Sequence, residues 1–342
     1  MKPLFYSDYQ EGAHPFILEQ IQNCNFEQNV GYGTDDYCSE AAEKIKECFK
    51  VPDADVHFLV GGTQTNATAI SSILRPFQGA LCASTAHIGV HETGIIEHGG
   101  HKVLPLPSKD GKITAKAIRD YVEDHFNGPS KEHTVQPGMV YISFPTELGT
   151  IYSKKELKAI SEVCREKNLP LYVDGARLGY GLMSSECDIE PEEFAQMVDM
   201  FYVGGTKQGA LFGEALVICN DKLKKDFRYC IKQNGGLLAK GWLLGIQFSA
   251  LFTDNLYFHL SYHADYQADK IRACLAEKGY KLLSKSPSNQ IFVVMDDVTL
   301  SRLEKSVGVE FWQKVDSNHS AIRICTSWAT TDEAVDTLIN CL

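Results

Sequence analysis

Lys207 is the residue of this sequence whose surroundings are most suited to chemistry. It lies between two apolar runs, residues 201–203 and 215–218, and glycines flank it on both sides. This arrangement predicts a strand, a tight turn that carries the lysine, and a second strand. Burial would disfavour the ammonium form, and a neutral amine can form a Schiff base. A hairpin tip that points Lys207 into water is the alternative, and this stretch alone does not decide between the two.

A second candidate site follows residues 55–60, which are predicted to form a strand. Gly61, Gly62 and Thr63 come next, and the later residues have a helical pattern. A helix N-terminus offers unpaired N–H groups and a positive dipole end to an anion, most often phosphate. The segment contains neither GxGxxG nor GxxxxGK[ST], so it resembles neither a dinucleotide fingerprint nor a P-loop. A helix simply capped by Thr63 is the alternative.

Three more polar side chains follow predicted strands, namely His87, Glu147 and Asp174. A buried carboxylate is costly without a partner, so Asp174 needs a cation or an N–H donor, and Arg177 is one candidate. Asp174 and Lys207 are about one β-α-β unit apart, so neighbouring strand ends would present both to one pocket. His87 and His91 have i, i+4 spacing without a third ligand or an HExxH motif, so we expect no metal site.

The composition is that of a soluble globular protein. The 342 residues are 44% hydrophobic and 23% charged, enough for one large and one smaller domain. A net charge of -11 argues against nucleic acid as a partner, and no apolar run reaches the length of a membrane helix. Eleven scattered cysteines without a CxxC pair predict free thiols and a cytoplasmic location.

Strands that alternate with helices between residues 55 and 203 would position these side chains. This pattern predicts an α/β fold whose parallel strands carry the site at their carboxyl ends. Long helices are predicted after the second apolar run, and they would suit a dimer surface. They span residues 221–233, 242–252 and 262–278. A smaller mixed part comes last, and its final helix has the capping-box pattern of Thr330 and Glu333.

Four motifs occur in a fixed order: Gly-Gly-Thr-Gln-x-Asn after a strand, a histidine after another strand, Asp-Gly-Ala-Arg-Leu, and Gly-Gly-Thr-Lys. In this order the sequence resembles fold-type-I pyridoxal-phosphate enzymes, and in particular the low-specificity L-threonine aldolases of the β-eliminating lyase family. The resemblance runs from Ser7 to Arg323. It implies a mostly parallel seven-stranded sheet in a large cofactor-binding domain (31–255), preceded by an N-terminal arm and helix (1–30) and followed by a smaller α/β domain (256–342).

The resemblance also assigns residues to the cofactor. Lys207 would carry pyridoxal 5'-phosphate as a Schiff base, and Asp174 would pair with the protonated pyridine nitrogen so that the ring stays an electron sink. Gly62 and Thr63 would bind the phosphate. The remaining residues implied around the cofactor are His87 on the ring face, Arg177 at the ring hydroxyl, Thr206 beside the lysine, and Lys240 from a neighbouring subunit.

The substrate would be held by another set of residues. Ser7 and Arg323 resemble the family's clamp for the substrate carboxylate, for which Arg177 is a further candidate. Many threonine aldolases have a histidine in the loop at residues 145–149 that touches the substrate hydroxyl, and here this loop contains Glu147 instead. We therefore expect His87 to be the base for the hydroxyl proton, with an ordered water as the second choice.

The function implied by the resemblance is that of a lyase. It would cleave a β-hydroxy-α-amino acid, L-threonine, L-allo-threonine or a phenylserine-like compound, into glycine and an aldehyde, as a homodimer or homotetramer. β-Elimination or transamination on the same cofactor is the alternative. A nicotinamide dehydrogenase would need a fingerprint that is absent, and a non-catalytic binding module would be expected to lack Lys207 or Asp174.

Overall fold

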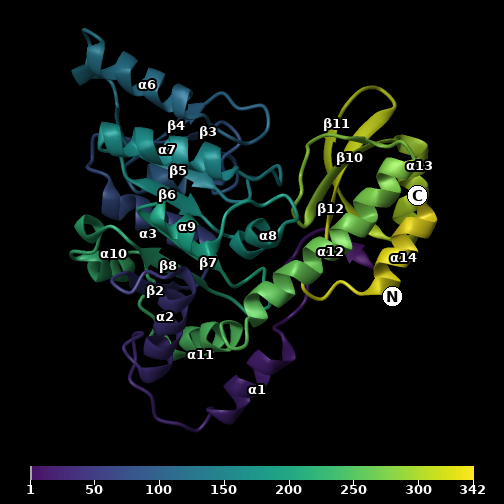
Figure 1. Cartoon of the computed structure of the whole chain (residues 1–342), viewed down its shortest axis with the longest axis horizontal. Coiled ribbons are helices and arrows are strands. Elements are labelled where there is room, and N and C mark those ends of the chain that lie inside the picture. Colours follow the sequence, from purple (N-terminus) through teal and green to yellow (C-terminus); the bar gives the residue numbers. More distant parts are fainter. Residues whose placement is uncertain (1) are drawn as a thin grey trace.

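The computed structural model describes residues 2–342, which form two β-sheets on either side of a long helix (Figure 1). The large sheet has seven strands in the order β2-β8-β7-β6-β5-β3-β4. A smaller, five-stranded sheet has the order β1-β11-β12-β10-β9. Helix α12 (Leu256–Glu277) extends from beside the large sheet to the small one (Figure 1).

The large sheet confirms the predicted α/β architecture. Strand β8 is antiparallel to both of its neighbours, and all other pairs in this sheet are parallel. Every residue of β6, β7 and β8 is buried, as expected when helices cover both faces of a sheet. The strands are β2 (Asp55–Leu59), β3 (Gln78–Ala83), β4 (Lys102–Leu106), β5 (Gln136–Ser143), β6 (Leu171–Asp174), β7 (Met200–Gly204) and β8 (Glu214–Ile218).

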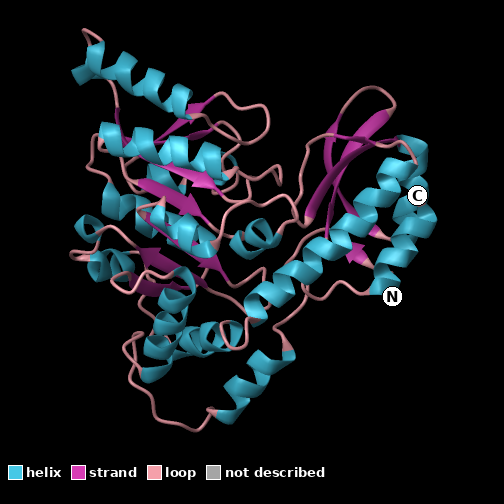
Figure 2. Cartoon of the chain, viewed as in Figure 1, coloured by secondary structure: helices cyan, strands magenta, loops and turns pink. Residues whose placement is uncertain are grey.

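Helices cover the large sheet, as the cyan ribbons of Figure 2 show. Helix α7 (Lys154–Lys167) begins with a capping box of Ser153 and Glu156 and ends at Asn168 in the left-handed conformation. The other helices before residue 256 are α1 (Pro15–Asn23), α2 (Asp36–Phe49), α3 (Gly62–Ile73), α4 (His87–Val90), α5 (Ile95–His98), α6 (Ala115–Asn127), α8 (Leu178–Met183), α9 (Pro191–Gln196), α10 (Phe227–Gln233) and α11 (Trp242–Leu251).

The small sheet has a buried cluster of its own, which includes Phe5, Ile291, Ile322 and Leu338. Strand β1 adds to this sheet in parallel with β11, although about 300 residues separate the two strands in the sequence. The remaining elements are β1 (Leu4–Phe5), β9 (Lys281–Leu282), β10 (Gln290–Asp296), α13 (Asp297–Ser306), β11 (Gly308–Lys314), β12 (His319–Cys325) and α14 (Asp332–Cys341). The domain boundaries at residues 30 and 255 stay a prediction.

Several local expectations were wrong. Helix α12 begins at Leu256 rather than at residue 262, and α10 begins at Phe227 after a short 3-10 turn rather than at residue 221. The cap of α14 is Thr331, whose side chain accepts from the Ala334 N–H, so Thr330 and Glu333 form no capping box. The N-terminal arm reaches the core through Phe5. No helix within residues 2–342 has the length and apolarity to cross a membrane.

Candidate active site

A cavity of about 310 Å³ lies at the carboxyl ends of the parallel strands of the large sheet. The structure thereby brings together side chains that follow five different strands, and these strands are far apart in the sequence. The predicted site residues that line this cavity are Gly62, Thr63, His87, Glu147, Asp174, Arg177, Thr206 and Lys207.

Lys207 lies on the turn between β7 and β8, and it is partly buried against the cavity. The hydroxyl of Tyr180 donates to the Lys207 carbonyl at 2.5 Å, which fixes the backbone of the turn. Burial and the nearby Arg177 guanidinium lower the pKa of Lys207, although the carboxylates of Asp8, Asp174 and Glu214 act against this shift. The alternative of a solvated lysine at a hairpin tip is therefore wrong, and the amine is primed to act as a nucleophile.

Asp174 ends strand β6 and is held by a set of donors, of which none carries a full positive charge. Tyr202 donates to Oδ1 at 2.5 Å, and Tyr141 and Asn66 donate to Oδ2 at 2.6 Å and 3.0 Å. Burial alone would raise the pKa of Asp174, but the charge of His87 and these hydrogen bonds outweigh it and lower the pKa. The cavity thus contains a buried, charged carboxylate that can pair with a cationic ring nitrogen.

Arg177 pairs with Asp8 of the N-terminal arm. The alternative in which Arg177 is the partner of Asp174 is therefore wrong. The Arg177 Nε and Nη2 donate to the two Asp8 oxygens at 2.6 Å and 2.9 Å, and Asn289 donates to the same carboxylate at 2.9 Å. The sequence reasoning singled out Ser7 and missed its neighbour Asp8. Ser7 is buried but does not line the cavity in the part of the chain that the structure describes.

His87 is oriented by Glu92, a residue that the sequence reasoning also missed. Its Nδ1 lies 2.7 Å from Glu92 Oε1, and the Glu92 side chain is fully buried. Asn66 Nδ2 donates to the same Glu92 oxygen at 2.7 Å and to Asp174 at 3.0 Å, so one amide connects the two carboxylates. The histidine and the aspartate are therefore held by one network. In the sequence, Glu92 is only a glutamate five positions after a histidine. Nothing in this pattern indicates that the glutamate side chain is buried.

The glycine turn at residues 61–63, where a phosphate is predicted to bind, leads into a helix as expected. Helix α3 begins after Gly61, whose backbone is extended, and no side chain caps the helix, so the alternative of a Thr63 cap is wrong. Gly62 and Thr63 line the cavity, and the first N–H groups of α3 have no helical acceptor. A Cβ atom at Gly62 would lie 3.1 Å from the Tyr202 hydroxyl oxygen, so a side chain there would crowd the residue that holds Asp174.

Arg323 lines a second cavity of about 300 Å³, which adjoins the first, since Tyr9, His87, Glu147, Arg177 and Lys207 line both. The guanidinium forms an ion pair with Glu310 and donates to the Tyr6 carbonyl at 2.9 Å and to Gln290 at 3.2 Å. Its Nε is buried and has no partner among residues 2–342. The guanidinium thus has one donor without a partner, in a side chain that lines the cavity where a substrate carboxylate is predicted.

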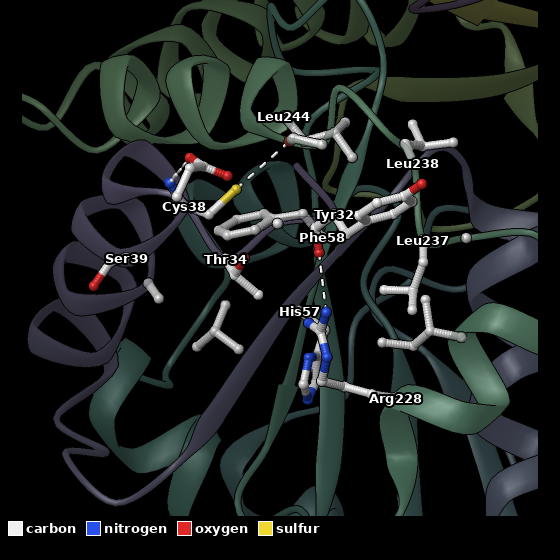
Figure 3. A pocket seen from close by; sticks show the side chains of 17 residues that line it. Tyr32, Thr34, Cys38, Ser39, His57, Phe58, Arg228, Leu237, Leu238 and Leu244 are labelled. Atoms are coloured by element: carbon white, nitrogen blue, oxygen red, sulfur yellow. Dashed lines mark hydrogen bonds between the residues drawn. The ribbon is translucent and has the colours of Figure 1, made fainter. Parts of the chain in front are cut away.

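Lys240 is exposed and lines neither of these cavities within the described residues. It lies on the loop at residues 236–241, of which Gly236, Leu237, Leu238 and Gly241 border a separate cavity of about 310 Å³ (Figure 3). In that cavity Tyr32 is joined to this loop by a hydrogen bond from its N–H to the Leu238 carbonyl at 3.1 Å. Arg228 donates to the Tyr32 carbonyl at 3.1 Å, as the dashed line in Figure 3 marks.

A lysine between two strand ends, a buried aspartate on the neighbouring strand and a helix N-terminus around one cavity define the class of fold-type-I pyridoxal-phosphate enzymes. Comparisons with known proteins agree with this class. The sequence profile of the beta-eliminating lyases matches residues 5–298. The chain belongs to this family, and it is therefore a pyridoxal-phosphate-dependent lyase.

Individual relatives match almost the whole chain. A low specificity L-threonine aldolase of a Pseudomonas species is 31% identical over 97% of this chain and 94% of its own. A solved structure of Leishmania major threonine aldolase is 43% identical, with a TM-score of 0.96 over 99% of this chain and 98% of its own. An aspartate aminotransferase of Thermus thermophilus shares the fold at 14% identity, with a TM-score of 0.71 over 100% of this chain and 96% of its own.

Proposed function

We propose that this chain cleaves L-threonine or L-allo-threonine into glycine and acetaldehyde. The observation that carries the proposal is one cavity lined by Lys207, Asp174 and the N-terminus of α3, next to the Arg323 donors. The relatives named as threonine aldolases support the choice of reaction.

The residues present fit pyridoxal phosphate. The lowered pKa of Lys207 makes a neutral amine available to the cofactor aldehyde. The buried Asp174 lines the cavity, and its lowered pKa supplies the negative charge that a cationic ring nitrogen would need. Gly62 and Thr63, at the N-terminus of α3, line the same cavity, where a phosphate would bind. When bound, the cofactor supplies a conjugated ring that accepts the electron pair of a bond broken at Cα.

The other side chains would position the substrate for this chemistry. Arg323 would exchange part of its contact with Glu310 for the substrate carboxylate, and Ser7, two positions before the cavity-lining Tyr9, would assist it. Asp8 holds Arg177 in a bidentate pair, so this guanidinium is fixed in direction before any ligand arrives. His87 would lie on the face of the cofactor ring, oriented by Glu92.

Product analysis tests the reaction directly. Purified protein with pyridoxal phosphate is expected to show a yellow absorption band that shifts when glycine is added, and to convert L-threonine into equal amounts of glycine and acetaldehyde. Ammonia with a keto acid would indicate β-elimination instead, and an amino-group transfer to a keto acid would indicate transamination. A colourless protein that takes up no cofactor would overturn the proposal.

We further propose that the enzyme is a homo-oligomer, a dimer or tetramer, in which Lys240 reaches the phosphate site of a neighbouring subunit. Lys240 is exposed and lies outside the Lys207 cavity of its own chain. The segment before Tyr32, which is hydrogen-bonded to the loop of Lys240, exposes the apolar side chains of Phe26 and Val30. A cytoplasmic location stays a prediction, and the eleven free cysteines are compatible with it.

Subunit mixing tests the role of Lys240. The variant Lys240→Ala is expected to bind the cofactor about tenfold more weakly, because one charge-assisted contact is lost. If the contact crosses subunits, dissociating and reassociating Lys240→Ala with the inactive Lys207→Ala in equal amounts should give about a quarter of the sites wild-type cofactor affinity for a dimer, because mixed dimers contain one complete site. Threonine cleavage at limiting pyridoxal phosphate measures this fraction. Lys222→Ala, at another exposed lysine, should bind normally. A mixture with no more activity at limiting cofactor than its Lys240→Ala dimers contribute would contradict the proposed contact.

A further inference from the structure

Cleavage of a β-hydroxy amino acid needs a group that takes the hydroxyl proton, and the side chains around Lys207 differ in their freedom to do so. Both Asp174 oxygens already accept hydrogen bonds, from Tyr202 and Ala176 and from Tyr141 and Asn66. This aspartate is therefore committed to its own network.

Glu214 is committed in the same way. It accepts from the Thr206 hydroxyl at 3.0 Å and from the Gly205 N–H at 3.2 Å, at the base of the turn that carries Lys207. His87 uses its Nδ1 for Glu92, and its ring is the group expected on the cofactor face. Of the carboxylates that line the Lys207 cavity, Glu147 therefore remains as the candidate to accept the hydroxyl proton.

Glu147 has a position that no other described residue shares. It lines the Lys207 cavity, the Arg323 cavity and an outer cavity of about 370 Å³. The outer cavity contains His91, Trp312 and Leu283 but neither His87 nor Lys207. A substrate with its amino group at Lys207 and its carboxylate at Arg323 would extend its β-carbon toward this outer space, past Glu147.

The carboxylate of Glu147 is held by one oxygen only. Its Oε1 accepts from the Ser143 hydroxyl at 2.6 Å and from the His87 backbone N–H at 2.8 Å. Among residues 2–342, no other residue donates a hydrogen bond to its Oε2. Burial raises the pKa of Glu147, although the hydrogen bonds from Ser143 and His87 oppose this rise. The group is thus fixed in direction, with one oxygen open to a ligand.

We propose that Glu147 is the catalytic base that accepts the β-hydroxyl proton of the substrate, an assignment that rests on the proposed function. The O–H electron pair becomes the second bond of the aldehyde C=O as the proton moves to Glu147. The Cα–Cβ electron pair is left on the glycine fragment, and one proton is returned to Cα. Glycine and acetaldehyde then account for all atoms of threonine. Glu147 replaces His87 as the expected base.

The variant Glu147→Gln tests this assignment, because it keeps the shape of the side chain and removes its basicity. Turnover of L-threonine should fall about 10²- to 10⁴-fold. Exchange of a glycine α-proton with D₂O uses the cofactor, Lys207 and Asp174 but no β-hydroxyl, so its rate should stay within about threefold of wild type. Glu162→Gln, an exposed glutamate, is the matched control and should leave both rates unchanged.

The outcomes separate the inference from the function. If wild-type protein forms no glycine and acetaldehyde, the proposed function fails. If wild type cleaves threonine and Glu147→Gln cleaves it equally fast, only the role of Glu147 is wrong. A variant that loses proton exchange together with cleavage would show a structural role and would also overturn the inference. In support of it, the acid limb of the kcat/KM profile should disappear in Glu147→Gln and persist in His87→Asn.

Discussion

Alanine at position 207 is expected to lower the turnover of L-threonine by at least about 10³-fold and to abolish the yellow absorption band. No other lysine lines the cavity within residues 2–342, so no neighbouring amine can take over its bond to the cofactor. Its nucleophilicity depends on a pKa that burial and Arg177 lower, and these surroundings are built by the β7–β8 turn. Steady-state kinetics and an absorption spectrum of the variant measure both effects.

The control for this experiment is Lys158→Ala, which removes an exposed lysine of helix α7. It should keep the spectrum and the activity of the wild type. Borohydride reduction of the wild-type holoenzyme, followed by peptide mapping, should label Lys207 and no other lysine. If Lys207→Ala retained full activity, the proposed site would be in the wrong place.

Replacing Asp174 by asparagine is expected to cost about 10²- to 10³-fold in turnover, because the negative charge that stabilises a cationic ring nitrogen is lost. An asparagine would also direct an NH₂ group at donors, since Tyr141, Tyr202 and Asn66 all donate to this side chain. Weaker cofactor binding should accompany the loss of turnover. A titration of apoprotein with pyridoxal phosphate measures the first effect and threonine cleavage the second.

The variant Tyr141→Phe separates charge from hydrogen bonding. It removes the 2.6 Å hydrogen bond to Asp174 but leaves the carboxylate in place. Turnover should fall only about tenfold, the scale of a single hydrogen bond to a charged group. Equal losses in Asp174→Asn and Tyr141→Phe would argue that the network, and not the charge, is what the reaction needs.

The large sheet could be predicted from sequence because its strands are short apolar runs followed by glycine or polar residues. The rule that sites lie at the carboxyl ends of parallel strands then placed His87, Glu147, Asp174 and Lys207 near one another, and in the structure they line one cavity. Strand β11 of the small sheet could not be predicted in this way, because it has little apolar periodicity and Phe311 in it is 57% exposed. Its pairing is determined by β12 and β1, which are partners that no local pattern reveals.

The groups that orient the site could not be predicted for the same reason. Asp8 meets Arg177, and Asn66 meets both Glu92 and Asp174, through contacts between residues far apart in the chain. A polar residue that is buried by tertiary packing has the same local sequence signature as an exposed one. The residues of the reactive centre were therefore accessible to sequence reasoning, whereas the network that fixes their directions was not.

The N-terminal arm has a consequence for the order in which the site is built during synthesis. Leu4 and Phe5 pair with Gly308 and Val309, and Arg323 donates to the Tyr6 carbonyl. Leu4 and Phe5 therefore acquire their place in the small sheet only after about 300 further residues have been synthesised. Until Asn289 has been synthesised, Asp8, which pairs with Arg177, lacks the hydrogen bond that Asn289 donates. A prematurely terminated chain could fold its large sheet and still have no assembled substrate clamp.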